Sequence, residues 1–174
     1  MKAAEIAALL EQKFPGEILG KNAEAINPYV LVAPAAIAKV ARFCRDDAAL
    51  KFDYLKDLCA VDWLIDDEKR AKKLGIEPKF EVMYQIFSFT HKHDFTLKTR
   101  VDRNKPDAPL PEVPTVSHVW DIANWHEREA YDMMGIHFTG HPGLRRILCP
   151  EDWEGFPLRK DYEFPLEYHG IRCR

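Results

Sequence analysis

The sequence has no excess of positive charge, a feature that nucleic-acid-binding domains usually carry on at least one face. Its 25 Lys and Arg residues are outnumbered by 28 Asp and Glu, and the formal net charge is −3. Because phosphate backbones attract basic surfaces, this balance disfavours a nucleic-acid-binding role. The sequence also contains no glycine-rich phosphate loop, dinucleotide-binding fingerprint or nucleophile elbow. No motif therefore predicts nucleotide binding or acyl transfer.

Long apolar runs and paired cysteines are missing too. The longest uncharged stretch, residues 25–38, has 14 residues and contains Pro28 and Pro34, whereas a membrane-spanning helix needs about 20 apolar residues. Glu5 places an acid where a secretion signal would be apolar, so we expect neither a signal peptide nor a membrane span. The cysteines at 44, 59, 149 and 173 lack metal-motif spacing, which predicts reduced thiols.

The first third of the chain carries alternating helix and strand patterns. With 174 residues and 47% hydrophobic composition, the chain is long enough for one domain with a real core. Apolar spacing predicts helices over residues 3–13 and 34–45. It predicts strands over residues 17–25 and 29–32. Residues 50–64 are ambiguous, and we expect a short helix there followed by a strand through Val61 and Trp63.

The clearest sheet signal lies in the middle of the chain. Apolar residues alternate over residues 80–86 and again over 95–101, with a turn at 91–94, which predicts an antiparallel hairpin. Residues 66–73 are rich in charge and predict a solvated loop. Residues 102–114 hold four prolines and predict a surface connection. Since helices and strands do not strictly alternate, we expect an α+β two-layer sandwich with a mixed or antiparallel sheet.

A short helix with capping signals follows the hairpin. Asn124 is placed to cap its N-terminus, with Glu127 completing a capping box, and Gly135 suits the C-terminal stop. Four charges fall within six residues, and helix pairs contribute only about 0.2 to 0.5 kcal/mol each.

The positions of the acidic residues indicate contacts outside the helix. Asp132, near the C-terminal end, needs a cation, and Arg128 lies one turn earlier. Glu127 and Glu129 point to different sides, so at least one is expected to contact another part of the protein or another chain.

The C-terminal arm, residues 142–174, combines turn residues with apolar ones. It holds four prolines, three glycines and five aromatic residues. The prolines argue against a regular helix or central strand, and the apolar content argues against disorder. We therefore expect an arm that lies extended along a surface of its own domain or of a partner, next to a globular domain of residues 1–141.

The stretch from Pro114 to Tyr162 carries a dense set of motifs. They read Glu127-Arg128-Glu129, Asp132 to Ile136, Gly140-His141-Pro142, Leu144 to Leu148, Pro150 to Gly155 and Pro157 to Tyr162. In this order they closely resemble the C subunit of NADH-quinone oxidoreductase, respiratory complex I.

The resemblance implies a non-catalytic structural subunit in the hydrophilic arm of a proton-pumping NADH:quinone oxidoreductase. It would dock mainly on the D subunit, the quinone-site protein of that complex, and near the iron-sulfur subunits. Iron-sulfur clusters, FMN and quinone would be carried by those partners, and none by this chain. The complex would lie peripherally on the cytoplasmic face of the inner (cell) membrane. The residues expected to contact partners are Glu127, Arg128, Glu129, Asp132, His141, Arg145, Arg146, Trp153, Arg159, Lys160, Asp161 and Tyr162.

Two alternatives stay open. The chain could be the equivalent subunit of a membrane-bound hydrogenase or of another ferredoxin or quinone oxidoreductase. It could also be a freestanding metal-dependent enzyme, since nitrogen, carboxylate and thiolate groups can bind a metal. The residues available for such a site are His126, Glu129, His137 and His141, with Cys149 as a further ligand.

Overall fold

A five-stranded mixed sheet forms one layer of the molecule. The computed structural model describes residues 1–65, 67–105 and 108–173. Strand β2 pairs in parallel with β5, and the other neighbours in this sheet are antiparallel. The strand order is β1 (Ile18–Asn22), β2 (Tyr29–Val32), β5 (His93–Asp102), β4 (Lys79–Ser88) and β3 (Tyr54–Asp62).

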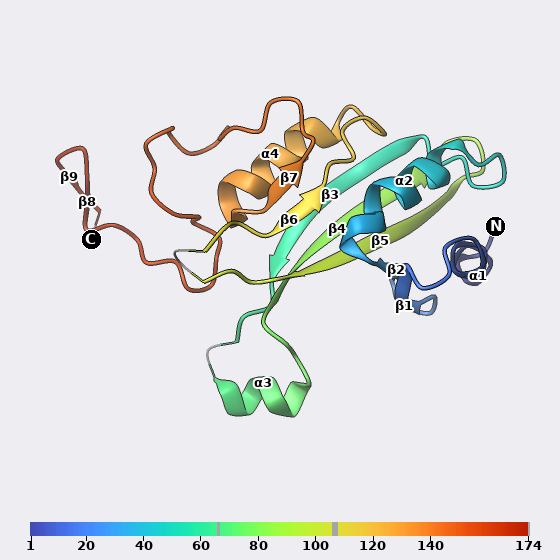
Figure 1. Cartoon of the computed structure of the whole chain (residues 1–174), viewed down its shortest axis with the longest axis horizontal. Coiled ribbons are helices and arrows are strands. Elements are labelled where there is room, and N and C mark those ends of the chain that lie inside the picture. Colours follow the sequence, from blue (N-terminus) through green and yellow to red (C-terminus); the bar gives the residue numbers. More distant parts are fainter. Residues whose placement is uncertain (66, 106–107, 174) are drawn as a thin grey trace.

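Helices and a small strand pair form the second layer. Figure 1 shows α2 and α4 lying along the sheet, with α1 beside β1 and β2. Two short parallel strands, β6 and β7, join this layer. The expected α+β two-layer architecture is confirmed. The elements are α1 (Ala3–Lys13), η1 (Pro34–Ala36), α2 (Ile37–Asp46), β6 (Glu112–Pro114), α4 (Ala123–Met134) and β7 (His137–Thr139).

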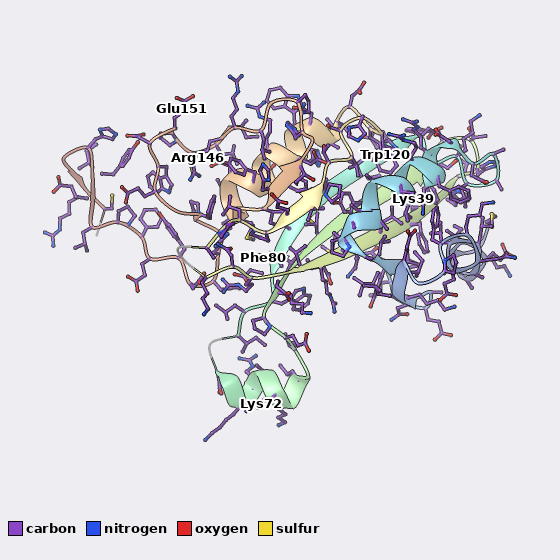
Figure 2. All side chains as sticks on the ribbon, viewed as in Figure 1. Lys39, Lys72, Phe80, Trp120, Arg146 and Glu151 are labelled. Atoms are coloured by element: carbon purple, nitrogen blue, oxygen red, sulfur yellow. The ribbon has the colours of Figure 1, made fainter. Side chains whose placement is uncertain are left out.

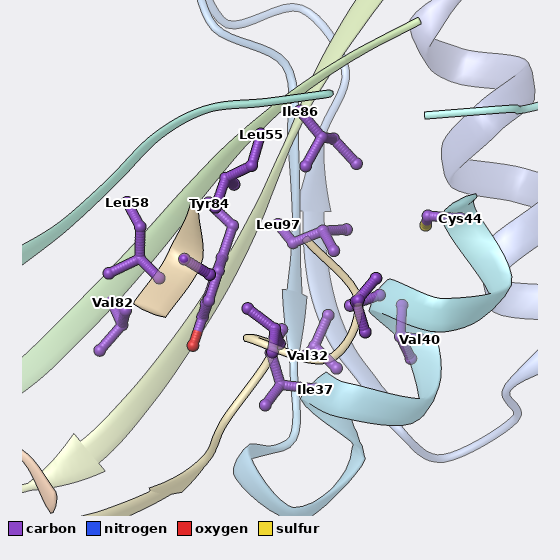
Figure 3. Packing of buried hydrophobic residues seen from close by; sticks show 14 of the residues in the cluster. Val32, Ile37, Val40, Cys44, Leu55, Leu58, Val82, Tyr84, Ile86 and Leu97 are labelled. Carbon is purple, nitrogen blue, oxygen red and sulfur yellow. The ribbon is translucent and has the colours of Figure 1, made fainter. Parts of the chain in front are cut away.

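The core lies between these layers and follows from the alternation of the hairpin. Phe80, Val82, Tyr84 and Ile86 of β4 have no exposed surface. Figure 3 shows the side chains of the sheet facing those of α2. Each large apolar side chain buried in this way contributes roughly 1.5–3 kcal/mol. The hairpin and the helix after Pro34 are thus confirmed, and both present their apolar residues to one core.

The predicted short helix at the start of residues 50–64 is wrong, because this stretch contributes the single long strand β3. The pairing of β3 with β4 shifts by one residue between Leu55 and Asp57, so Lys56 forms a bulge. A bulge inserts one residue and resets the alternation of faces. Leu55 and Leu58, three residues apart, are consequently both buried, and their spacing imitates a helix.

The predicted solvated loop of residues 66–73 is also wrong, with Asp66 itself outside the described residues. Residues Glu68–Leu74 form helix α3. The Asp67 side chain accepts hydrogen bonds from the N–H groups of Lys69 and Arg70, and Gly75 ends the helix in the left-handed conformation. Figure 1 shows α3 standing off from the sheet, so it is solvated as expected but helical.

Two further segments carry more structure than expected. The connection of residues 102–114 ends in β6, although residues 106 and 107 lie outside the described part. Near the end of the chain, β8 (Glu167–Tyr168) and β9 (Ile171–Arg172) form a two-stranded hairpin. No helix in the described residues has the length and apolar character needed to cross a bilayer.

The bulge in β3 generates a stability prediction. Because Leu55 and Leu58 both lie in the core, Leu55→Ala and Leu58→Ala should each lower the free energy of unfolding by about 2–5 kcal/mol. The control Lys56→Ala removes an exposed side chain between them and should change it by at most about 1 kcal/mol. Urea denaturation of the three variants measures this. Equal effects at all three positions would contradict the bulged strand.

Candidate partner-docking surface

Helix α4 starts two residues earlier than its capping signals indicate. Its N-cap position is Ile122, and no side chain caps the helix. The predicted cap at Asn124 is therefore wrong, since this residue lies within the first turn. Gly135 does end the helix, with φ 66° and its N–H bonded to the Tyr131 carbonyl at 2.8 Å.

Gly135 is required for a second reason. A Cβ at this position would lie 2.5 Å from Phe156 Cε2 and 2.6 Å from Arg159 Nη2. Both residues belong to the C-terminal arm, which therefore packs against the end of α4. Only glycine combines the left-handed backbone with this close approach.

Glu127 turns into the protein instead of capping its own helix. One carboxyl oxygen accepts the Val116 N–H at 2.7 Å, and the other bonds to the Thr115 hydroxyl. The side chain has no exposed surface. Burial raises the pKa of Glu127 to about 7, against the opposing effect of these hydrogen bonds. Glu127 thus ties α4 to the segment that follows β6.

His141 lies next to this carboxyl group, at 4.0 Å from Nε2 to Glu127 Oε2. The Asn124 carbonyl accepts a hydrogen bond from Nε2 at 3.1 Å, and Gly143 donates its N–H to Nδ1 at 3.0 Å. These partners require a neutral ring protonated on Nε2. Burial lowers the pKa of His141, which agrees with that form.

The Asp132 carboxylate holds the first part of the C-terminal arm. Its Oδ2 accepts the N–H groups of Ile147, Leu148 and Cys149 at 2.9, 2.7 and 2.9 Å. Its Oδ1 pairs with Arg146 Nη1 at 2.6 Å, and Figure 2 shows Arg146 in the loop beside α4. Burial by itself would raise the pKa of Asp132, but these donors outweigh it and lower the pKa. The cation that Asp132 needs is Arg146, not Arg128.

Arg159 holds the arm to the C-terminal end of α4. Its Nε donates to the Met134 carbonyl at 2.7 Å, and its Nη2 donates to the Gly135 carbonyl at 3.3 Å. Its guanidinium lies over the rings of Phe80 and Phe156, 4.9 and 4.6 Å from the centroids. A cation at this helix end also suits the macrodipole.

Asp62, at the end of β3, is a second buried carboxylate that holds the arm. Arg103 binds it through two hydrogen bonds of 2.9 and 3.0 Å, and Lys160 donates its backbone N–H at 2.9 Å. Arg103 also pairs with Asp161 at 2.7 Å. Asp62 and Arg103 are not among the site residues predicted from the sequence. An acidic residue at the end of one strand and an arginine at the end of the hairpin do not by themselves indicate that the two side chains pair and hold the arm.

The expected contact residues divide by exposure. Glu127 and Asp132 are fully buried and Arg128 nearly so, stacked on Trp125 and bonded to the Arg145 carbonyl. Their side chains contact other residues of this chain, and their expected role as partner contacts stays a prediction. The exposed members are Glu129, Arg145, Lys160 and Asp161, and the half-buried ones are His141, Arg146, Trp153, Arg159 and Tyr162.

The arm leaves apolar side chains facing outward. Leu148 is 61% exposed and Leu166 72% exposed. Leu158, Phe164 and Ile171 are exposed as well. Figure 1 shows the hairpin β8–β9 farthest from the sheet, at the end of the arm.

An aromatic cluster supports the outer part of the arm. Trp153 packs on Phe164 and Tyr168, with ring centroids 5.7 and 5.0 Å apart. Asp152 accepts a hydrogen bond from the Tyr168 hydroxyl at 2.8 Å and pairs with His169 at 2.7 Å. The division into a domain of residues 1–141 and a docking arm stays a prediction.

The residues considered for a metal site do not come together. His126 Nδ1 accepts the Leu58 N–H at 2.9 Å, which caps the free edge of β3. His137 pairs with Glu112, and both ring nitrogens of His141 have partners. Within the described residues, no group of three or more His, Cys, Asp and Glu side chains could hold a metal ion.

Removing the Asp132 charge should release the inner arm. Asp132→Asn is expected to lower the free energy of unfolding by about 2–4 kcal/mol and to speed amide exchange at residues 147–149. Since its pKa is lowered, the wild-type contribution is complete above the unfolded pKa and disappears as pH falls through the folded one. Hydrogen–deuterium exchange measures the release, with the half-exposed Asp161→Asn as control. Unchanged exchange at residues 147–149 would contradict this role.

Glu127 should make stability depend on pH in the opposite direction. Its pKa rises from 4.5 to about 7 on folding, so the folded chain binds more protons in this window. Stability should therefore fall by up to roughly 3 kcal/mol as pH rises from 4.5 to 7. Glu127→Gln should flatten this slope, and exposed Glu129→Gln should not. Urea titrations at pH 5 and 7.5 measure the difference. An identical slope in the Glu127 variant would exclude the assignment.

Known proteins resemble this chain over most of its length. Residues 30–168 match the family described as the respiratory-chain NADH dehydrogenase, 30 Kd subunit. The C subunit of NADH-quinone oxidoreductase from Roseiflexus sp. (strain RS-1) is 46% identical over 164 residues, which cover 94% of this chain and 86% of that protein. The same subunit of Chloroherpeton thalassium is 41% identical over 94% of this chain and 62% of its own length.

A solved structure shares the fold. It is that of the membrane-bound sulfane sulfur reductase, an archaeal respiratory membrane complex, with a TM-score of 0.70, 24% identity, and coverage of 94% of this chain and 86% of that one. At this identity the likeness concerns the fold alone. The match over residues 30–168 and the identity to the bacterial proteins decide the family. This chain belongs to the C-subunit family of NADH-quinone oxidoreductase, respiratory complex I.

Proposed function

We propose that the chain is a structural subunit of a proton-pumping NADH:quinone oxidoreductase. Its membership of the C-subunit family supports this proposal, because the related proteins carry that name. In the assembled enzyme, other subunits carry FMN, the iron-sulfur clusters and quinone, and electrons pass through them from NADH. This chain contributes binding surface and lies with the complex on the cytoplasmic face of the membrane.

The docking partner in this proposal is the D subunit, referred to below as the quinone-site subunit, with iron-sulfur subunits nearby. The observation that carries it is a backbone held by polar contacts while three of its leucine side chains are directed outward. Asp132 and Asp62 bind residues 147–149 and 160, while Leu148, Leu158 and Leu166 stay exposed. Such a surface is pre-organised, so little conformational entropy is lost when a partner covers it.

Charged side chains at the edge of this surface would orient the partner. Arg145, Lys160 and Glu129 are exposed around the apolar residues. Rim charges of this kind change association rates and register more than affinity. The apolar side chains would then contribute most of the binding free energy.

Replacing the exposed leucines should detach the quinone-site subunit. A chain with Leu148→Ser, Leu158→Ser and Leu166→Ser loses apolar contacts only where it faces outward, so the domain should fold normally while co-purification with that partner from native membranes falls at least about tenfold. Ile26→Ser, at a fully solvent-exposed apolar residue away from the arm, is the control. Partners are identified by mass spectrometry. Undiminished recovery of the quinone-site subunit with the triple variant would refute this docking mode.

A further inference from the structure

Two hollows meet on the face of the sheet opposite to α2 and α4. One of about 470 Å³ runs across β1 and β2 to the end of β3, and its lining includes Leu19, Leu31 and Trp63. The other, about 880 Å³, lies under α3 and also reaches Trp63. Both are lined by Trp63, Gly75, Ile76 and Glu77. They therefore form one continuous groove, which we call the α3 groove.

The floor of the α3 groove is apolar and open. Leu31 and Trp63 point away from the core, since their neighbours Val32 and Asp62 face inward. Leu19 is 60% exposed, and Leu74, which precedes the lining residue Gly75 in the chain, is 54% exposed. The Trp63 Nε1 atom is inaccessible to solvent and has no hydrogen-bond partner among the described residues. Exposed apolar surface rimmed by polar groups is typical of a contact site.

The rim of the groove on the α3 side is basic. Lys72 lines the hollow, and Lys69 and Lys73 are exposed on the same helix without lining it. Figure 2 shows Lys72 on the helix that stands off from the sheet. Among the side chains that the structure describes, these three lysines form no ion pair, whereas Glu77 on the opposite rim pairs with Lys79 at 3.1 Å.

The β5 side of the groove adds positive charge. Arg100 lines the smaller hollow and donates to buried Glu81 at 2.6 Å, and Lys98 binds the same carboxylate at 3.0 Å. Two cations on one carboxylate leave one positive charge on this face.

We propose that the α3 groove docks an acidic amphipathic segment of another protein chain. Its apolar side chains would pack on Trp63, Leu31 and Ile76, and its carboxylates would face Lys72. Lys69 and Lys73 would add positive charge from the same helix. Segments of this kind bind grooves through apolar residues spaced along one face, and an indole at the centre of a contact is a frequent energetic hot spot. Charge complementarity selects the acidic partner.

This surface is separate from the one used in the proposed function. Figure 1 places α3 and the hairpin β8–β9 at different extremities of the molecule. A second contact of this kind would hold the chain between two partners.

Photo-crosslinking in the native complex tests the proposal. Benzoylphenylalanine replaces Leu74, next to the groove residue Gly75, or, as a matched control, Phe89, which is 55% exposed in the turn after β4. The Leu74 probe should yield a cross-linked peptide from one other chain, identified by mass spectrometry, that combines apolar and acidic residues. A lipid adduct, a neutral or basic peptide, or no product specific to Leu74 would overturn the proposal.

Charge variants sharpen the result. Lys69→Glu, Lys72→Glu and Lys73→Glu together should lower the cross-link yield at least about tenfold, and the corresponding Lys→Arg variants should preserve it. An unchanged yield after charge reversal would also overturn the proposal. Circular dichroism checks that the variants fold. Recovery of the quinone-site subunit, measured in the same samples, should persist, so failure of this groove and failure of arm docking are distinguishable.

Discussion

The C-terminal arm depends on one carboxylate, that of Asp132. Three consecutive backbone N–H groups and a guanidinium converge on it. A segment interrupted by prolines cannot satisfy its backbone through a sheet ladder, so its donors need acceptors elsewhere. Burying the charge is costly by itself, and these donors together offset the cost. The arm is therefore ordered up to residue 166 although the structure describes no helix or strand there.

Asp62 repeats this arrangement at the far end of the sheet, where it binds the backbone of Lys160 and the side chain of Arg103. Polar groups consequently hold much of the arm, and Leu148, Leu158 and Leu166 are left on the outside. In an ordinary domain, apolar side chains hold a segment and polar ones face water. This inversion explains how a chain can be well ordered alone and still carry a surface suited to a partner.

The sheet divides the molecule into two sides with different tasks. Its inner face is filled by α2, α4 and the hairpin side chains, and it supplies most of the stability. Its outer face keeps a groove between the strands and α3. In the two docking modes proposed above, the arm and the outer face would be separate contact surfaces.

The sequence pattern was enough to predict an element wherever that element buries one regularly spaced apolar face in the core. The hairpin, α1, α2 and Gly135 follow from alternation, helical spacing and turn chemistry, because burial of one face dictates the residues on it. The exposed apolar arm was also foreseeable, since its composition suits neither a regular element nor disorder. The resemblance of the motifs between Pro114 and Tyr162 was enough to predict the family.

The contacts between segments could be known only from the tertiary structure. The bulge at Lys56 made Leu55 and Leu58 look helical, and only pairing with β4 shows them on one strand face. From the sequence, Glu127 and Asp132 look like surface charges of a short helix. In the structure, Glu127 is buried by the segment that follows β6, and Asp132 is buried by the arm. The sequence determined which residues are apolar, charged or conformationally special. The fold decided which charged side chains are buried. The hydrogen-bond partners of a buried carboxylate come from segments outside its own helix, and only the tertiary structure places them next to it.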